Sequence, residues 1–144
     1  MERKLEDAGL LFLRITVPAT LIVLHGWQKL IDPAPFIAVL AEKGFFFPKL
    51  LGYLSIAAET IFPLLVMLGV ATRFSAFVVS INMFIAAFVF HMIINSDPVK
   101  IWEKAFIYML VFVFFTITGP GGASLEKLLT RKGKKNVKLR GGTA

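Results

Sequence analysis

Long apolar segments are the feature that most constrains the fold of this chain. A helix that crosses a lipid bilayer needs about 20 mainly apolar residues. Residues 50–70 and 74–94 meet this length with at most one charged residue each. Residues 8–31 meet it although Arg14 interrupts them, and residues 100–118 meet it if their polar first turn is included. The sequence therefore predicts an all-α integral membrane protein whose four transmembrane helices form an antiparallel bundle.

The composition agrees with that of a membrane protein. Apolar residues make up 57% of it, charged residues only 17%, and its mean hydropathy is +0.77. A soluble domain has roughly 45–50% apolar and about 25% charged residues, so an ordinary soluble globule, a fibrous protein and a disordered chain are all disfavoured. The chain has no cysteine, which excludes disulfides, thiolate metal sites and covalent haem attachment. Neither a metal site nor a covalently bound cofactor is predicted, so any redox role needs a bound molecule or a partner that carries electrons.

Basic residues are concentrated after the last apolar segment. The formal net charge is +7, and no aromatic residue lies among the tail cations to stack on nucleic acid bases. A basic segment that follows a membrane span is typical of contact with anionic lipids. We therefore predict one membrane domain over residues 1–126 and a basic cytoplasmic tail over residues 127–144, with no nucleic acid partner. The seven tail cations are Lys127, Arg131, Lys132, Lys134, Lys135, Lys138 and Arg140.

Lysine and arginine counts on the two sides predict the orientation. With the N-terminus inside, the cytoplasmic side carries ten cations, namely Arg3, Lys4, Arg73 and the seven of the tail. The other side carries five, namely Lys29, Lys43, Lys49, Lys100 and Lys104. Because cytoplasmic loops carry the excess of Lys and Arg, both termini are predicted to be cytoplasmic in a multi-pass protein of the plasma (inner) membrane. The charge inside the first apolar run favours an uncleaved span over a signal peptide.

The connections between spans differ in kind. Residues 71–73, which are enough only for a tight turn, connect the second and third spans. This predicts that these helices are antiparallel neighbours. The first outer loop, residues 32–49, contains a short amphipathic stretch and the run Phe45-Phe46-Phe47 beside lysines. Such a segment either lies in the membrane interface or folds back into the mouth of the bundle.

Three polar residues within the spans are predicted to share one central layer. Counting about 1.5 Å per residue from the cytoplasmic helix ends places Arg14, Asn82 and Glu59 between about 9 and 16 Å deep. Ionisable groups at such depth are costly and need a partner, so we predict that Arg14 pairs with Glu59. The pair either fixes helix register or takes part in ligand or proton binding. Pro18 and Pro63 each follow a member of this pair by four residues and free its carbonyl from the helix.

A second polar group is predicted near the outer surface. The same count places His25 and His91 both about 25 Å from the cytoplasmic ends of their helices. His25 and Lys29 share a helix face with Arg14. The histidines are candidates for catalytic proton transfer, while His25, Lys29 and Glu103 are candidates for ligand binding. The alternatives are histidines that only form hydrogen bonds, or a pair of histidines that ligates haem.

These residues suggest an outward-facing pocket rather than a hydrolytic site. The sequence has no Gly-rich phosphate loop, HExxH or GxSxG motif. A pocket of His, Lys and aromatic side chains can hold a quinone head group or a small oxyanion, with the phenylalanines contacting an isoprenoid tail.

The order of these features resembles that of the DoxX family of small membrane proteins. The similarity covers roughly residues 10–126. Its pieces are Arg14, the segment His25-Gly26-Trp27-Gln28-Lys29-Leu30, Glu59, Leu68-Gly69, Thr72-Arg73, His91, Glu103, Tyr108, Gly119-Pro120-Gly121 and Ser124-Leu125. Glu126 stands where the family more often has Asp. The resemblance implies a four-helix membrane protein.

The resemblance also implies several functions. Some relatives are subunits of thiosulfate:quinone oxidoreductase, and others are membrane anchors for thiol and oxidative-stress enzymes. We therefore expect a membrane subunit of a redox-linked complex that contacts the quinone pool, with other subunits or copies of itself as partners. The alternatives are a non-catalytic anchor or assembly subunit, or a small solute or proton carrier.

Overall fold

The computed structural model of the protein describes residues 2–122 and 124–127, with side chains from residue 5 onward. These residues form helices and connecting turns and contain no strand. In chain order the elements are α1 (Glu2–Leu21), the π-helix η1 (Ile22–Gly26), α2 (Trp27–Ile31), α3 (Ala34–Glu42), α4 (Pro48–Leu68), α5 (Thr72–Phe84), the π-helix η2 (Ile85–Ile94) and α6 (Val99–Thr118). Of the predicted basic tail, only Lys127 lies within the described residues.

The predicted fold class is confirmed. Four helical segments are long and apolar enough to span a membrane, and their ends lie within three residues of the predicted spans. They are Leu5–Ile31, Pro48–Leu68, Thr72–Ile94 and Val99–Thr118. The first and third spans each combine α-helix with a π-helical segment.

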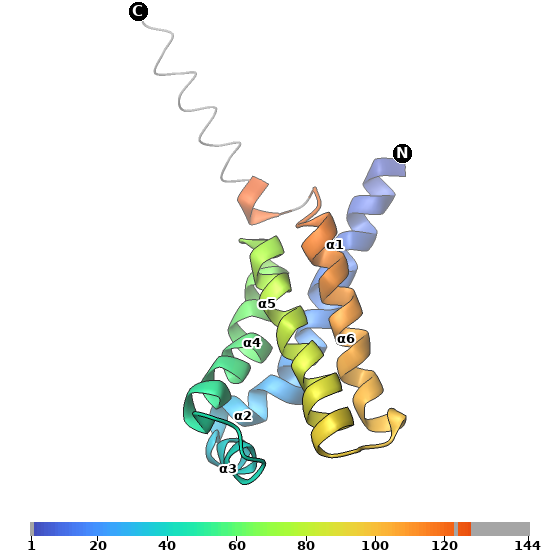
Figure 1. Ribbon diagram of the computed structural model, residues 1–144. Helices are drawn as coiled ribbons and strands as arrows, with labels where there is room; N and C mark the ends of the chain where they lie inside the picture. Colours follow the sequence, from blue (N-terminus) through green and yellow to red (C-terminus); the bar gives the residue numbers. More distant parts are fainter. Residues whose placement is uncertain (1, 123, 128–144) are drawn as a thin grey trace, which may run out of the picture.

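Successive spans run antiparallel, so both ends of the described chain lie at one end of the bundle (Figure 1). We call this the terminal end, and the opposite end, where α3 lies, the α3 end. Helix α5 packs between α4 and α6, as the short connection between the second and third spans predicts, and α1 crosses the bundle obliquely. Helix α1 contacts α4 extensively and α6 much less.

The buried core is small for a chain this apolar. Its members come from all four spans, and they are Leu21, Val66, Ala76, Val79, Met83, Phe112 and Phe115. Many large apolar side chains point outward instead, as Phe12, Phe77 and Ile117 do. Such outward surface would be unfavourable in water, but in a bilayer the lipid chains cover it, as the long apolar spans require.

Two helices approach each other closely where η1 crosses α4. A side-chain carbon added at Gly26 would lie 2.4 Å from the main-chain oxygen of Glu59 and 2.7 Å from Thr60 Cγ2. Pro63, four residues after Glu59, has no N–H to donate to that oxygen. The Cα–H of Gly26 therefore points at a carbonyl that the helix leaves without its usual donor, a contact found at close helix crossings.

We predict that Gly26→Ala weakens this crossing. The added methyl group overlaps the Glu59 carbonyl, so η1 must move away from α4, which costs about 1–3 kcal/mol of unfolding free energy. The measurement is unfolding of the purified protein in detergent. Gly9→Ala is the matched control, because nothing lies within 4 Å of that position on the same helix, and unchanged stability of Gly26→Ala would contradict the close crossing.

Candidate functional site

A buried ion pair joins the first and second spans. Lys29 Nζ lies 2.8 Å from Glu59 Oε1 and 2.7 Å from Oε2. The Glu59 side chain is 4% exposed and that of Lys29 26%, so the carboxylate is enclosed while the ammonium reaches the edge of the bundle. Gly26 lies one turn before Lys29 on the same continuous helix, and its close contact with α4 places the lysine beside the carboxylate.

Other polar groups complete the surroundings of this carboxylate. Ser55 Oγ and Asn82 Nδ2 each lie 3.4 Å from Glu59 Oε1. On the opposite side, the ring centroid of Phe36 lies 4.3 Å from Lys29 Nζ, close enough for a cation–π interaction. Phe36 belongs to α3, which therefore forms a cap over the pair. The sequence predicted Glu59 and Asn82 in one layer, and the structure brings them together.

The predicted pairing of Arg14 with Glu59 is wrong. Arg14 Nη1 instead donates a hydrogen bond to the carbonyl of Pro120, after the last span. A side-chain carbon added at Gly69 would lie 2.9 Å from the same nitrogen. Gly69 is ten residues beyond Glu59, or about 15 Å along the helix axis. Arg14 thus lies at the terminal end of the bundle, and the predicted single layer divides into two separate clusters.

Side-chain direction explains this error. Every Cα–Cβ bond of a helix tilts toward the helix N-terminus, and a long side chain can carry its charge to the nearer membrane boundary. The N-terminus of α1 lies at the terminal end, so Arg14 extends toward that end and away from Glu59. For the same reason Lys29, although it lies deeper along the first span, points back toward Glu59.

The segment that follows α6 forms hydrogen bonds with several elements at the terminal end of the bundle. Besides the Pro120 carbonyl that accepts from Arg14, its Gly122 N–H donates to Asp7 Oδ1 at 2.6 Å. Its Glu126 N–H donates to the Gly69 carbonyl at 3.3 Å, which ties it to the connection between α4 and α5. Ser124 Oγ accepts from the Lys127 N–H at 3.3 Å, as expected of a cap for the short helix after the last span. Asp7 lies two turns before Arg14 on the same face of α1, a spacing that could have identified it.

His25 lines a cleft between the first and fourth spans. The cleft has a volume of about 470 Å³ and is lined by Leu24, His25, Lys104, Ile107 and Tyr108. The His25 ring meets the Tyr108 ring edge to face, with 5.8 Å between centroids. The Tyr108 hydroxyl lies 3.3 Å from Thr20 Oγ1 and can donate to it. His25 thus shares the cleft with Lys104 and Tyr108.

The other predicted ligand-binding residues are placed differently. Glu103 is exposed and does not line this cleft, whereas its neighbour Lys104 does. Lys29 points to Glu59 on α4, whereas His25 points to Tyr108 on α6. The predicted stripe of Arg14, His25 and Lys29 therefore faces the bundle interior but contacts three different partners.

His91 lies apart from His25. Its Nδ1 is 2.8 Å from Asp97 Oδ2 in the connection between η2 and α6, and the Asp97 N–H donates to the His91 carbonyl at 2.9 Å. Because a carboxylate only accepts, Nδ1 carries the proton in this contact. The hydrogen bond from His91 holds the pKa of Asp97 below its ordinary value of 3.8. The structure thus gives His91 a local partner that the sequence pattern had not indicated.

The arrangement suits binding and proton exchange more than metal chemistry. Among the described residues, no group of three or more His, Cys, Asp or Glu side chains could hold a metal ion. The cleft offers an imidazole, a phenol and an ammonium group beside apolar side chains, which can bind a polar head group attached to an apolar chain.

Comparison with known proteins identifies the family. The family model of DoxX matches residues 9–92, more than half of the chain. This chain belongs to the DoxX family. It is 31% identical over 137 residues to inner membrane protein YqjF of Escherichia coli (strain K12), covering 90% of this chain and 98% of that protein. It is also 31% identical over 127 residues to an uncharacterized protein of Haemophilus influenzae (strain ATCC 51907 / DSM 11121 / KW20 / Rd), covering 85% and 92% of the two chains. No solved structure matches the chain.

Several of the residues that carried the resemblance to DoxX proteins meet in space. Arg14, Gly69, Pro120 and Ser124 lie together at the terminal end. The segment that contains Gly26 and Lys29 meets Glu59 in the other half of the bundle. These separate pieces of the DoxX sequence pattern thus form two contact clusters, whereas His91, Glu103 and Tyr108 lie outside both.

We predict strong coupling between Lys29 and Glu59. Lys29→Met leaves the buried carboxylate without its cation, and Glu59→Gln leaves the lysine without its anion, so each costs on the order of 3 kcal/mol of unfolding free energy. The double variant loses much less than the sum, because no uncompensated charge remains. Unfolding of each variant in detergent measures these values. When Arg14→Gln is combined with Glu59→Gln, the two losses of unfolding free energy should add, since distant sites are independent. Additive losses for Lys29 and Glu59, together with non-additive losses for Arg14 and Glu59, would contradict the assignment.

We also predict that His91 controls the titration of Asp97. Because the folded pKa of Asp97 is depressed, the contact stabilises the connection above the ordinary carboxyl pKa and is lost as the pH falls through the folded value. The carboxyl ¹³C shift of Asp97 should therefore titrate below 3.8, and its midpoint should rise in His91→Phe, which has no donor. Lys43→Gln, which removes a weaker influence on the same group, should raise it less. An unchanged midpoint in His91→Phe would exclude this contact.

Proposed function

We propose that this DoxX protein is an inner-membrane subunit of a redox-linked complex and that its cleft binds the head group of a quinone. The observation that carries the proposal is the cleft between η1 and α6, where His25, Lys104 and Tyr108 face apolar side chains. Its volume of about 470 Å³ lies within the range of small-molecule sites. Helices α1 and α6 make few contacts with each other, which gives a lipid-soluble molecule a route into the cleft from the bilayer.

Each polar group of the cleft has a defined task in this proposal. The His25 imidazole donates a hydrogen bond to one quinone oxygen. The Tyr108 hydroxyl, which otherwise donates to Thr20 Oγ1, turns its one proton to the other quinone oxygen. The positive charge of Lys104 attracts the electron-rich oxygen atoms of the quinone near the membrane surface. Leu24 and Ile107, both largely exposed, contact the ring edge and the start of the apolar tail. The quinone exchanges its electrons with a partner subunit that carries the redox centre, because this chain has no cysteine to ligate a redox metal cluster.

The location and orientation are part of the same proposal. The relative from Escherichia coli is described as an inner membrane protein, and the excess of Lys and Arg at the terminal end favours a cytoplasmic position for that end. The cleft and the Lys29–Glu59 pair then lie in the half of the bundle toward the outer surface, where protons exchange with the external solution.

Binding of a short-chain ubiquinone analogue to the purified protein tests this function. Tryptophan quenching is the readout, because Trp102 lies in the turn of α6 that precedes Lys104 and Tyr108. Each lost hydrogen bond is worth about 0.5–1.5 kcal/mol, so His25→Ala and Tyr108→Phe should weaken binding about 3- to 10-fold. Tyr53→Phe is the matched control, because Tyr53 is the other tyrosine of the chain and is exposed outside the cleft.

Two outcomes would contradict the proposal. If the His25 and Tyr108 variants bind the analogue as tightly as the unaltered protein, the quinone does not use this cleft. If the unaltered protein does not bind it, the chain fits a non-catalytic membrane anchor, in which the two polar clusters only hold the helices together.

A further inference from the structure

Two phenylalanines at the α3 end are unusually exposed. Phe46 is 86% exposed and Phe47 76%, more than the other large apolar residues of the described chain. Phe45, directly before them, is turned inward, and its ring lies 6.3 Å from that of Phe90. The run of three phenylalanines is therefore divided, with one ring packed against η2 and two rings directed away from the protein.

The backbone turns these two rings outward. Phe47 has φ 53° and ψ 55°, a left-handed conformation that bulky residues rarely adopt. It is the residue before α4, and its carbonyl accepts from the Leu51 N–H at 3.1 Å. Gly44, with φ 77°, provides the preceding change of direction. The chain thus holds an unfavourable conformation whose result is to expose two apolar rings.

The length of α4 places these rings at a membrane boundary. Its 21 residues, Pro48–Leu68, span about 31 Å, close to the thickness of about 30 Å of the hydrocarbon layer. Pro48 therefore lies near one edge of that layer, and Phe46 and Phe47 lie just beyond it. Aromatic side chains concentrate at this level of membrane proteins.

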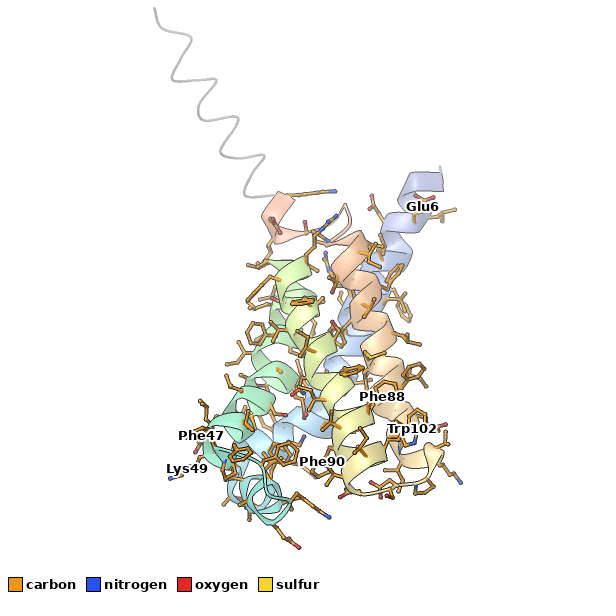
Figure 2. The ribbon with its side chains drawn as sticks, in the orientation of Figure 1. Glu6, Phe47, Lys49, Phe88, Phe90 and Trp102 are labelled. Atoms are coloured by element: carbon orange, nitrogen blue, oxygen red, sulfur yellow. The ribbon has the colours of Figure 1, made fainter. Side chains whose placement is uncertain are left out.

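Charged residues on both sides of the rings match lipid head groups. Lys43 and Lys49 are both exposed and flank the pair of phenylalanines in the chain. Figure 2 shows Phe47 and Lys49 at the outer edge of the bundle at the α3 end, whereas Phe90 lies nearer its middle. Lysine side chains at this level can bind lipid phosphates while the neighbouring rings enter the acyl region.

Helix α3 is fixed to the bundle by one face only. Ile37 occupies the space beside Gly52, where an added side-chain carbon would lie 2.7 Å from Ile37 Cγ1, and Leu40 is buried. Ala38 and Ala41 on the other face are exposed. Contact with lipid at the C-terminal side of α3 therefore complements its packing on α4 and keeps Phe36 over Lys29.

We propose that Phe46 and Phe47, with Lys43 and Lys49, form a membrane anchor that inserts into the leaflet at the α3 end and binds phospholipid phosphates. The anchor holds α3 as a cap over the Lys29–Glu59 pair. The same exposed rings could instead contact another protein, but their position directly beyond a span and between two lysines favours lipid. This anchor does not depend on the proposed quinone function.

Spin labelling in vesicles of phosphatidylethanolamine and phosphatidylglycerol tests the anchor. The chain has no cysteine, so Phe46→Cys and Phe47→Cys each give a single labelled site in the full-length protein. Collision with oxygen, which concentrates in lipid, is compared with collision with a water-soluble nickel complex. Phe84→Cys within the third span is the lipid-exposed reference, and Glu42→Cys in the last turn of α3 is the water-exposed reference.

Labels at positions 46 and 47 should collide several-fold more with oxygen than with nickel, a ratio far above that of the reference at position 42 and nearer that of the reference at position 84. Measuring each site separately keeps the test decisive if one variant does not fold. Labels that resemble the reference at position 42 would overturn the anchor, because the rings would then face water. Labels protected from both reagents would also overturn it, because a protein surface would then cover the rings.

Discussion

A charge inside a bilayer needs a partner, and the organisation of this DoxX protein depends on how that requirement is met for Glu59. Its carboxylate receives both hydrogen bonds from Lys29, which removes the large cost of an isolated buried charge. The contact requires the first span to approach α4 closely, and Gly26 permits this at a carbonyl that Pro63 leaves without a helical donor. The ion pair, the glycine and the proline are therefore parts of one helix crossing, which α3 covers through Phe36.

A second requirement operates at the terminal end, where Arg14 must also be satisfied at low exposure. The carbonyl of Pro120 accepts from the guanidinium there. This carbonyl reaches Arg14 because the chain after α6 turns back over the bundle at Gly119 and Gly121, which both have positive φ values. The segment thereby joins α1, the connection between α4 and α5, and the end of α6. Two distant residues of the family pattern, Arg14 and Pro120, are explained by this single contact.

The sequence was sufficient for the fold but not for the polar contacts. The length of the apolar segments identifies the spans, because the thickness of the bilayer sets that length. All four spans are confirmed. Pairing depends on side-chain direction, and depth along an ideal helix placed Arg14 beside Glu59 although its side chain extends the opposite way. The π-helical segments η1 and η2 add a second difficulty, because they alter the angles that an ideal helix predicts between Arg14 and Lys29 in the first span and between Asn82 and His91 in the third. Tyr108 belonged to the family pattern, but only the structure places it beside His25.

The two clusters also bear on the cleft that lies between them. They hold the first span at two points. Arg14 is bound by the segment after α6, and Lys29 is bound by Glu59, while the contacts of the first span with α6 are few. Thr20 and His25 lie between these points and supply the contacts with Tyr108. The π-helical segment η1 lies between these two points, and such segments are frequent at functional sites. In the proposed function, the two clusters therefore keep the remaining helices in place while a ligand binds beside His25.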